Sequence, residues 1–258
     1  MKKLTVLIIA LLLVTAAGVG IYLDGTHLAQ YRYTVSYLEV EAENVPDSFE
    51  DFRILYLTDL EYGSYVGTQH LQKLTDTISA LDYDLVIFGG DLFDSDYIPV
   101  SDDITQLTSF FAAISGRYGS LAITGEMDRI SDGRRNITAK ILEDAGFELI
   151  EGAIRIHHDN DPYITVYALA EEENEPVNTE SVTIGLAHDY SHDLLPEAQL
   201  VLAGHAHDRQ INLPFVSSTK LGRHGNLYRS RGLGLTGEPI RIFSDPELVI
   251  ITFHHKAQ

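Results

Sequence analysis

The first hydrophobic stretch of the chain lies at its N-terminus and carries no charge. Leu4 to Leu23 follows Met1-Lys2-Lys3, and about twenty helical residues just cross a bilayer core of about 30 Å. We interpret 4–23 as a single transmembrane anchor. Residues 1–3 are then a cytoplasmic stub and the C-terminal domain is extracytoplasmic, because lysines favour the cytoplasmic side. The alternatives are a cleaved signal peptide, since Val14-Thr15-Ala16 supplies small residues of the cleavable kind, and a buried core helix.

Beyond the anchor, strand-like runs alternate with helical periodicity. Alternating apolar and polar residues over 31–40 predict a half-exposed strand, and we assign 24–48 to a linker and this first strand. Apolar residues then recur at helical spacing in three segments: 71–81, 104–114 and 137–145. Short apolar, β-branched runs separate the helices and predict buried strands: 54–57, 85–88 and 121–123.

After Gly146 the pattern of apolar and polar residues becomes typical of strands. A turn cluster at Asp159-Asn160-Asp161-Pro162 separates two strand-like runs and predicts a hairpin. Further strands are expected at 182–186, 200–203 and 247–253. An αβ unit followed by a more antiparallel one predicts two sheets packed face to face with helices outside. We assign 49–258 to one α/β domain of this kind.

Composition removes several functions from consideration. The 258 residues carry a formal net charge of −20, so the lysines and arginines needed to neutralise nucleic-acid phosphates are outnumbered. We therefore expect no nucleic-acid partner. The chain has no cysteine, which excludes disulfides, zinc-thiolate sites and thiol nucleophiles.

Five of the predicted strands are each followed by residue types that bind metals. In open α/β sheets, ligand sites lie just beyond the carboxyl ends of the strands. The candidate ligands at these ends are Asp59, Glu61, Asp91, Glu126, His188, His205 and His207. Carboxylates and imidazoles delivered to one rim predict a metal site. The alternative is a set of polar residues whose only role is to form hydrogen bonds with the backbone of the loops.

These motifs, in this order, resemble those of the calcineurin-like metallophosphoesterases over about 33–253. Gly89-Gly90-Asp91-Leu92-Phe93-Asp94 and Gly204-His205-Ala206-His207 carry the resemblance. The anchor, with Arg231-Gly232-Leu233-Gly234 and Pro239-Ile240-Arg241-Ile242-Phe243, resembles the bacterial membrane-anchored phosphohydrolase branch. The resemblance implies a four-layer α/β/β/α sandwich of two mixed sheets. It also implies two divalent ions that activate a hydroxide for attack on phosphorus.

The resemblance assigns the candidate ligands to two metal positions. Asp59, Asp91 and His207 would hold the first ion, and Asp91, His188 and His205 the second. Where the family has Asp-x-His and Gly-Asn-His-Asp, this chain has Asp59-Leu60-Glu61 and Gly125-Glu126-Met127-Asp128. Glu61 and Glu126 can still coordinate. Met127 stands where the family places an acidic histidine, and a thioether donates no proton. Among catalytic groups this leaves only Asp128 as a candidate.

The two glutamates change the charge of the predicted site. Four carboxylates with two divalent ions sum to about zero, whereas two aspartates with the same ions sum to about +2. The attraction for an anionic phosphoester is weaker as a result. The extra oxygens favour Mn²⁺ or another hard ion over Zn²⁺.

Three hypotheses follow from the sequence. The first is a membrane-anchored, metal-dependent phosphoester hydrolase with altered or reduced activity, acting on a small phosphomonoester or phosphodiester or on a lipid head group. The second is a catalytically inactive relative that serves as a metal- or ligand-binding module. The third is a scaffold in which the carboxylates bind Ca²⁺ for stability alone.

Overall fold

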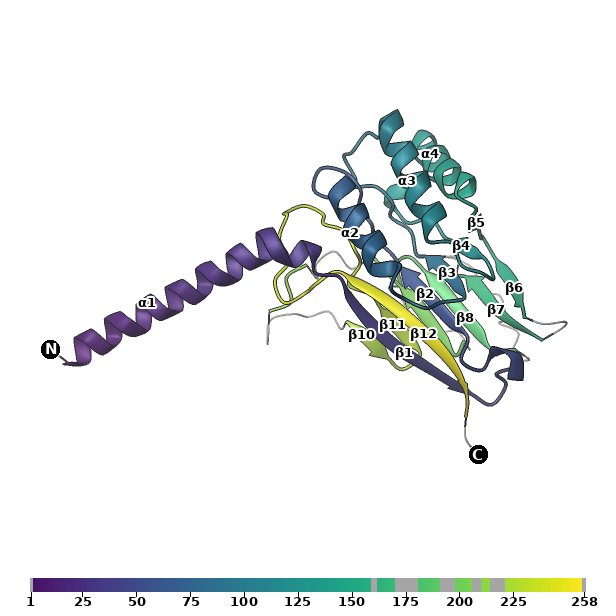
Figure 1. The fold of residues 1–258 in the computed structure, drawn as a ribbon, viewed down its shortest axis with the longest axis horizontal. Coiled ribbons are helices and arrows are strands. Elements are labelled where there is room, and N and C mark those ends of the chain that lie inside the picture. The colour runs from purple at the N-terminus through teal and green to yellow at the C-terminus, as the bar shows by residue number, and fades with distance from the viewer. Residues whose placement is uncertain are drawn as a thin grey trace.

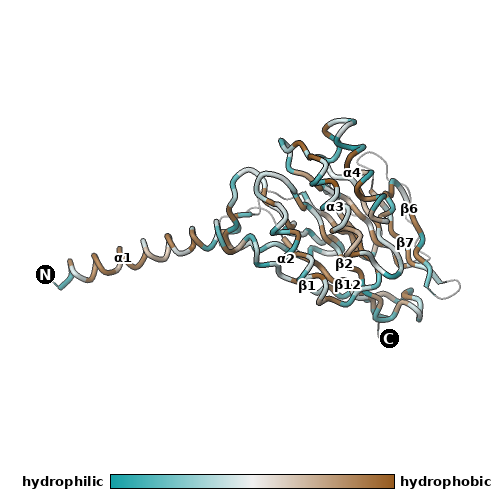
Figure 2. Tube along the Cα trace, turned by 45° about the horizontal axis from the view of Figure 1, so that its top comes forward, coloured by the Kyte–Doolittle hydropathy of each residue, from teal (hydrophilic) through white to brown (hydrophobic). Residues whose placement is uncertain are grey.

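A computed structural model describes residues 2–158, 162–169, 181–190, 198–205, 210–213 and 221–256. Its N-terminal helix α1 (Lys2–Leu23) projects away from the rest of the chain and has no buried residue (Figure 1). Hydrophobic residues dominate α1 in Figure 2, and the helix is long and apolar enough to cross a membrane. A core helix of a soluble domain would be buried, so that alternative for 4–23 fails.

The first sheet has six strands and contains both ends of the folded region. Its order is β1 (Thr34–Ala42), β12 (Glu247–His255), β2 (Arg53–Leu57), β3 (Leu85–Phe88), β4 (Ser120–Ala122) and β5 (Glu148–Leu149). The last strand of the chain, β12, lies between β1 and β2, parallel to β1 and antiparallel to β2. The remaining neighbours, β2 to β5, are parallel. Residues after the anchor are therefore bound into the sheet along the whole of β1.

The second sheet packs face to face with the first. Its order is β10 (Gly222–His224), β11 (Leu227–Arg229), β9 (Leu200–Ala203), β8 (Thr183–Ala187), β7 (Tyr163–Ala168) and β6 (Ala153–His157). The expected hairpin is β6 and β7, while β7, β8, β9 and β11 run parallel. Both sheets are mixed. The two-sheet α/β fold class is confirmed.

Strand alternation divides the buried residues between two cores. Ile54 and Tyr56 face the second sheet, whereas Leu55 and Leu57 face the helices. Three helices cover that outer face of the first sheet: α2 (Thr68–Ile78), α3 (Ser101–Ala113) and α4 (Asp132–Asp144). The described residues place no helix on the outer face of the second sheet, so the fourth layer of the expected sandwich falls outside what they describe.

Candidate metal centre

Four of the predicted ligands stand just after strands with backbones in the left-handed region. Their φ angles are 53° for Asp59, 50° for Glu61, 54° for Asp91 and 60° for His205. Non-glycine residues rarely adopt this conformation, which costs about 1–3 kcal/mol each and concentrates at functional sites. The loops after β2 and β3 also bond to each other, since Asp59 N donates to Gly90 O and Glu61 N to Asp91 O. The strained turns therefore aim ligand-type side chains from separate strands at one place.

The side chains form two groups with metal-binding geometry, and the groups share one residue. Asp59, Glu61 and Asp91 make one group; Asp91, His188 and His205 make the other. Within each group the candidate ligand atoms all lie within 4.8 Å of one another. Asp91, which is fully buried, belongs to both. Asp91 could therefore contribute a ligand atom to an ion held by either group.

The ring of His188 is fixed from both sides. Its Nδ1 lies 2.8 Å from the Gly89 carbonyl oxygen, and its Nε2 lies 2.8 Å from Asp91 Oδ2. A backbone carbonyl beside one ring nitrogen is how proteins orient a metal-binding histidine, because the N–H there leaves the other nitrogen for the metal. Burial alone would lower the pKa of His188, but its hydrogen bond to Asp91 and the charge of Asp59 raise it to about 9.

Glu61 gives a test of whether a cation fits this site. Burial raises the pKa of its carboxyl to about 10, and the nearby charges of Asp91 and Asp59 add to the effect. Protein interiors do not hold several close carboxylates in charged form unless a cation neutralises them. A donor set of three buried carboxylates and two imidazoles matches divalent ions that accept oxygen and nitrogen together. The residues present fit a pair of such ions.

The segment Arg231-Gly232-Leu233-Gly234 forms the wall behind Asp59 and Glu61. A Cβ on Gly234 would overlap the Leu60 carbonyl oxygen, so only glycine fits there. The buried guanidinium of Arg241 donates to the carbonyls of Gly232 and Gly234 at 3.2 and 2.6 Å. Sequence reasoning used this segment only as a mark of resemblance. The two closely spaced glycines are the signal that a backbone passes close to another element.

Glu126 and His207 are not among the clustered ligands of the described residues. The Glu126 side chain is 63% exposed, with Oε2 3.9 Å from His205 Nδ1, which places it at the rim. Neither of the two groups includes it. Met127 donates its backbone N–H to Asp91 Oδ1 at 2.8 Å, so this loop touches the shared aspartate through its main chain. His207 lies outside the described residues.

Asp128, the remaining catalytic candidate, is fully buried and saturated with hydrogen bonds. Its Oδ2 accepts from the backbone N–H groups of Asp91 and Gly125 at 2.9 and 2.8 Å. Its Oδ1 accepts from Leu92 N and Thr138 Oγ1 at 3.0 and 3.2 Å. Burial raises the pKa of this carboxyl, and the charge of Asp91 adds to the rise. We infer that Asp128 ties the loop after β4, which carries Glu126, to the loop after β3, which carries Asp91.

We expect Asp128→Ala to lower the free energy of unfolding by at least about 3 kcal/mol, because each buried N–H left without an acceptor costs about 1–3 kcal/mol. Chemical denaturation of the purified chain in the presence of chelator measures it. Asp144→Ala is the control, since Asp144 pairs with an exposed lysine one helical turn away and its loss should leave stability nearly unchanged. Equal stability of the two variants would contradict the tying role.

Comparison with known proteins finds relatives of one kind, although no family model matches the chain. An uncharacterised metallophosphoesterase of Campylobacter jejuni is 28% identical, covering 82% of this chain, which spans 62% of that protein's length. A transmembrane protein with metallophosphoesterase domain of Danio rerio is 26% identical over 83% of this chain and 56% of its own length. An uncharacterised metallophosphoesterase of Aquifex aeolicus is 24% identical over 90% and 95%. The resemblance to metallophosphoesterases is confirmed.

Proposed function

We propose that the chain is a membrane-anchored, metal-dependent phosphoester hydrolase that uses Asp59, Glu61, Asp91, His188 and His205, together with His207, to hold two divalent ions. One observation carries the proposal: the two groups of ligand-type side chains meet at a buried Asp91. The relatives support the class of reaction, since they are metallophosphoesterases.

The chain's own residues supply position and charge. Two divalent ions, when bound, provide Lewis-acid polarisation of the phosphoryl oxygens and an activated water. Asp91 faces both ligand groups, and Asp59 Oδ1 accepts the backbone N–H of His205 at 2.9 Å, which couples the loops after β2 and β9. The Gly89 carbonyl keeps the His188 ring in one orientation. Arg241 holds the glycine segment against Asp59 and Glu61.

Proton donation to the leaving group is the weak part of this site. Met127 offers only a thioether, and Asp128 is buried beneath the loop with its oxygens engaged. Loss of a general acid costs about 10²–10⁴-fold in rate, and least when the leaving group is already stable as an anion. The proposed enzyme therefore favours substrates with good leaving groups. Oxygen-rich coordination favours Mn²⁺ over Zn²⁺.

Anchor and charge support a location at the cell membrane. α1 is exposed along its length, and its lysines precede the apolar span, which favours an extracytoplasmic domain. The substrate is then a small phosphoester or a lipid head group. A net charge of −20 argues against nucleic acid.

A second candidate is a binding module without turnover. It is favoured by Met127 and by the third carboxylate, Glu61, which lowers the sum of the ligand charges with two ions from about +2 to about +1 and weakens attraction for an anionic substrate. This candidate keeps the metal centre but not the reaction. A scaffold stabilised by Ca²⁺ would have neither the two bound metal ions nor the reaction.

The full chain in detergent, stripped by chelator and resupplied with Mn²⁺, is expected to hydrolyse an activated aryl phosphodiester, because that leaving group needs no acid. Release of the aryl alcohol measures turnover, and renewed chelation should abolish it. No turnover with two transition ions bound per chain would replace the hydrolase with the binding module. One bound Ca²⁺ and no transition ion would support the scaffold.

A further inference from the structure

We propose that an apolar surface beside the end of α1 docks on the outer face of the bilayer that this helix spans. This membrane-facing patch consists of Ile211, Leu213, Ile242 and Phe243. Its exposed members are Ile211 at 41%, Leu213 at 40% and Phe243 at 59% of their surface. The inference rests on the membrane anchor of the proposed function and adds a second contact with lipid.

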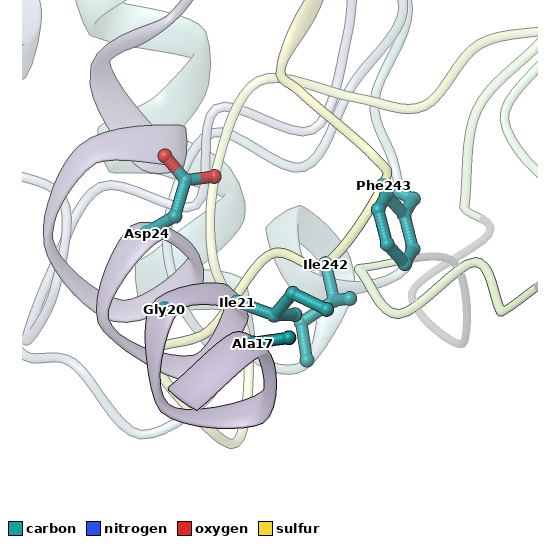
Figure 3. Close-up of a pocket in the computed structure, with 6 residues that line it drawn as sticks. All are labelled: Ala17, Gly20, Ile21, Asp24, Ile242 and Phe243. Carbon is teal, nitrogen blue, oxygen red and sulfur yellow. The ribbon is translucent and has the colours of Figure 1, made fainter. Parts of the chain in front are cut away.

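The depth of α1 in the membrane places the patch at the lipid interface. Ala17, Gly20 and Ile21 of the apolar span line a cleft of about 370 Å³ whose opposite wall is Ile242 and Phe243. Figure 3 shows Ile242 beside Ile21 and Ala17, with Phe243 following it along the same loop. The span has only the roughly twenty residues that a bilayer core requires, so residues from Ala17 onward lie within about 10 Å of its outer edge. Side chains level with them meet the lipid interface.

The end of α1 is attached to the loop that carries the patch. The chain leaves α1 through a further helical turn (Asp24–Leu28) in which Gly25 is buried. A Cβ on Gly25 would lie 2.7 Å from the Arg241 carbonyl oxygen, and Arg241 N donates to Gly25 O at 2.9 Å. Arg32 also bridges Asp24 and Asp245 by ion pairs. The loop that carries Ile242 and Phe243 is therefore fixed to the end of α1.

The patch is apolar, whereas the chain as a whole is acidic. Ile242 pairs with the neighbouring segment, because Asn212 N donates to Ile242 O and Ile242 N to Gln210 O. This pairing sets Ile211 beside Ile242, with Leu213 and Phe243 close by along the two segments, and Phe243 stands at φ 52°, a conformation rare for an aromatic residue. The chain is strongly acidic, so attraction to anionic lipid cannot hold it on a membrane. Burial of apolar side chains in the interface can.

The patch is coupled to the metal centre through one residue. Arg241 precedes Ile242 and bonds the Gly232 and Gly234 carbonyls that pack against Asp59 and Glu61. Docking therefore holds the candidate site close to the bilayer surface. A phosphoester presented from that surface would reach it without leaving the membrane.

Site-specific fluorescence on the full chain tests the proposal, since the chain has no cysteine and single cysteines can be introduced. Leu213→Cys and Phe243→Cys carry a bimane label in phosphatidylcholine vesicles with lipids spin-labelled near the head group. Tyr37→Cys, at a residue 72% exposed on β1, and Lys140→Cys on α4 are the controls. Leu12→Cys, at the middle of α1, reports insertion of the anchor in matched vesicles whose lipids are spin-labelled near the end of the acyl chain.

Quenching at positions 213 and 243 is expected to exceed that at 37 and 140 by at least about twofold, because only the patch enters the interface. Adding Phe243→Glu to Leu213→Cys should reduce quenching at 213, whereas adding Tyr37→Glu should not. Quenching at 213 and 243 equal to the controls, with Leu12→Cys quenched, would overturn docking and leave the anchor. An unquenched Leu12→Cys would overturn the anchor and the docking with it.

Discussion

Asp91→Asn is expected to reduce divalent uptake from two ions per chain to at most one. It should also lower Mn²⁺-dependent hydrolysis of an aryl phosphodiester by at least about 100-fold, the upper end of the 10–100-fold loss seen for residues that only orient ligands. The reason is that, among the described residues, Asp91 alone belongs to both ligand groups, and an amide has one oxygen and no charge with which to bridge two cations. Metal analysis of the dialysed variant and initial rates measure the two effects.

Glu50→Gln is the matched control for Asp91→Asn. Glu50, Asp51 and His254 form a third group whose ligand atoms lie within 4.8 Å, but it is largely exposed and far from the strand ends that carry the predicted site. Unchanged uptake and activity are expected from Glu50→Gln. The amide oxygen introduced by Asp91→Asn can still accept the Met127 N–H, so the fold should remain. Chemical denaturation in the presence of chelator checks this, because a variant that has lost only the metal site keeps its free energy of unfolding. If Asp91→Asn bound two ions and kept full activity while Glu50→Gln bound one ion fewer, the metal site would have to lie at the exposed cluster instead.

Replacing the residues that depart from the family motifs, through Glu61→His, Glu126→Asn and Met127→His together, is expected to raise kcat/KM for an alkyl phosphoester by about 10²-fold or more. A histidine introduced by Met127→His can protonate a poor leaving group, which is worth about 10²–10⁴-fold. Removing two carboxylates also returns positive charge to the site and strengthens its attraction for phosphate. Rates on alkyl and aryl esters measured in parallel show where the gain falls.

The contrast between the two esters identifies the source of that gain. An aryl ester with a good leaving group should gain far less than the alkyl ester if proton donation is what Met127 lacks. Met127→Leu is the control for size, and it should change neither rate. Glu61→His with Glu126→Asn alone separates the charge effect from the acid. Equal or lower activity of the triple variant on both esters would remove the basis for interpreting these positions as altered catalytic residues.

Local patterns predict much of this fold because central strands of the first sheet, such as β2 and β3, are short apolar runs. Leu85-Val86-Ile87-Phe88 is buried throughout, as a central parallel strand should be. What such patterns do not contain is pairing between distant segments. Thr34 stands opposite Glu247 in the parallel pair of β1 and β12, and nothing in either segment specifies that partner. The short strands β10 and β11 could not be predicted either, because they lie in a region rich in glycine and arginine.

In the candidate site, too, some residues could be predicted from the sequence and others could not. Asp59, Asp91, His188 and His205 each stand within three residues of a strand end, so strand direction alone brings them to one rim. Glu126 stands four residues past β4, as Glu61 does past β2, but Glu126 has a right-handed backbone before the turn Met127–Arg129, whereas Glu61 has φ 50°. Sequence reasoning gave it the same weight as Glu61, whereas Glu61 is buried among the ligands and Glu126 is mostly exposed. Arg241 was missed because an isolated arginine is ordinarily solvated.

Titration calorimetry on the folded, chelator-stripped chain measures how many divalent ions it binds. We expect uptake of two Mn²⁺ ions per chain, reduced in Asp91→Asn and unchanged in Glu50→Gln. A folded chain that takes up no divalent ion would rule out both the hydrolase and the binding module, because both depend on cations held between Asp59, Asp91 and His188.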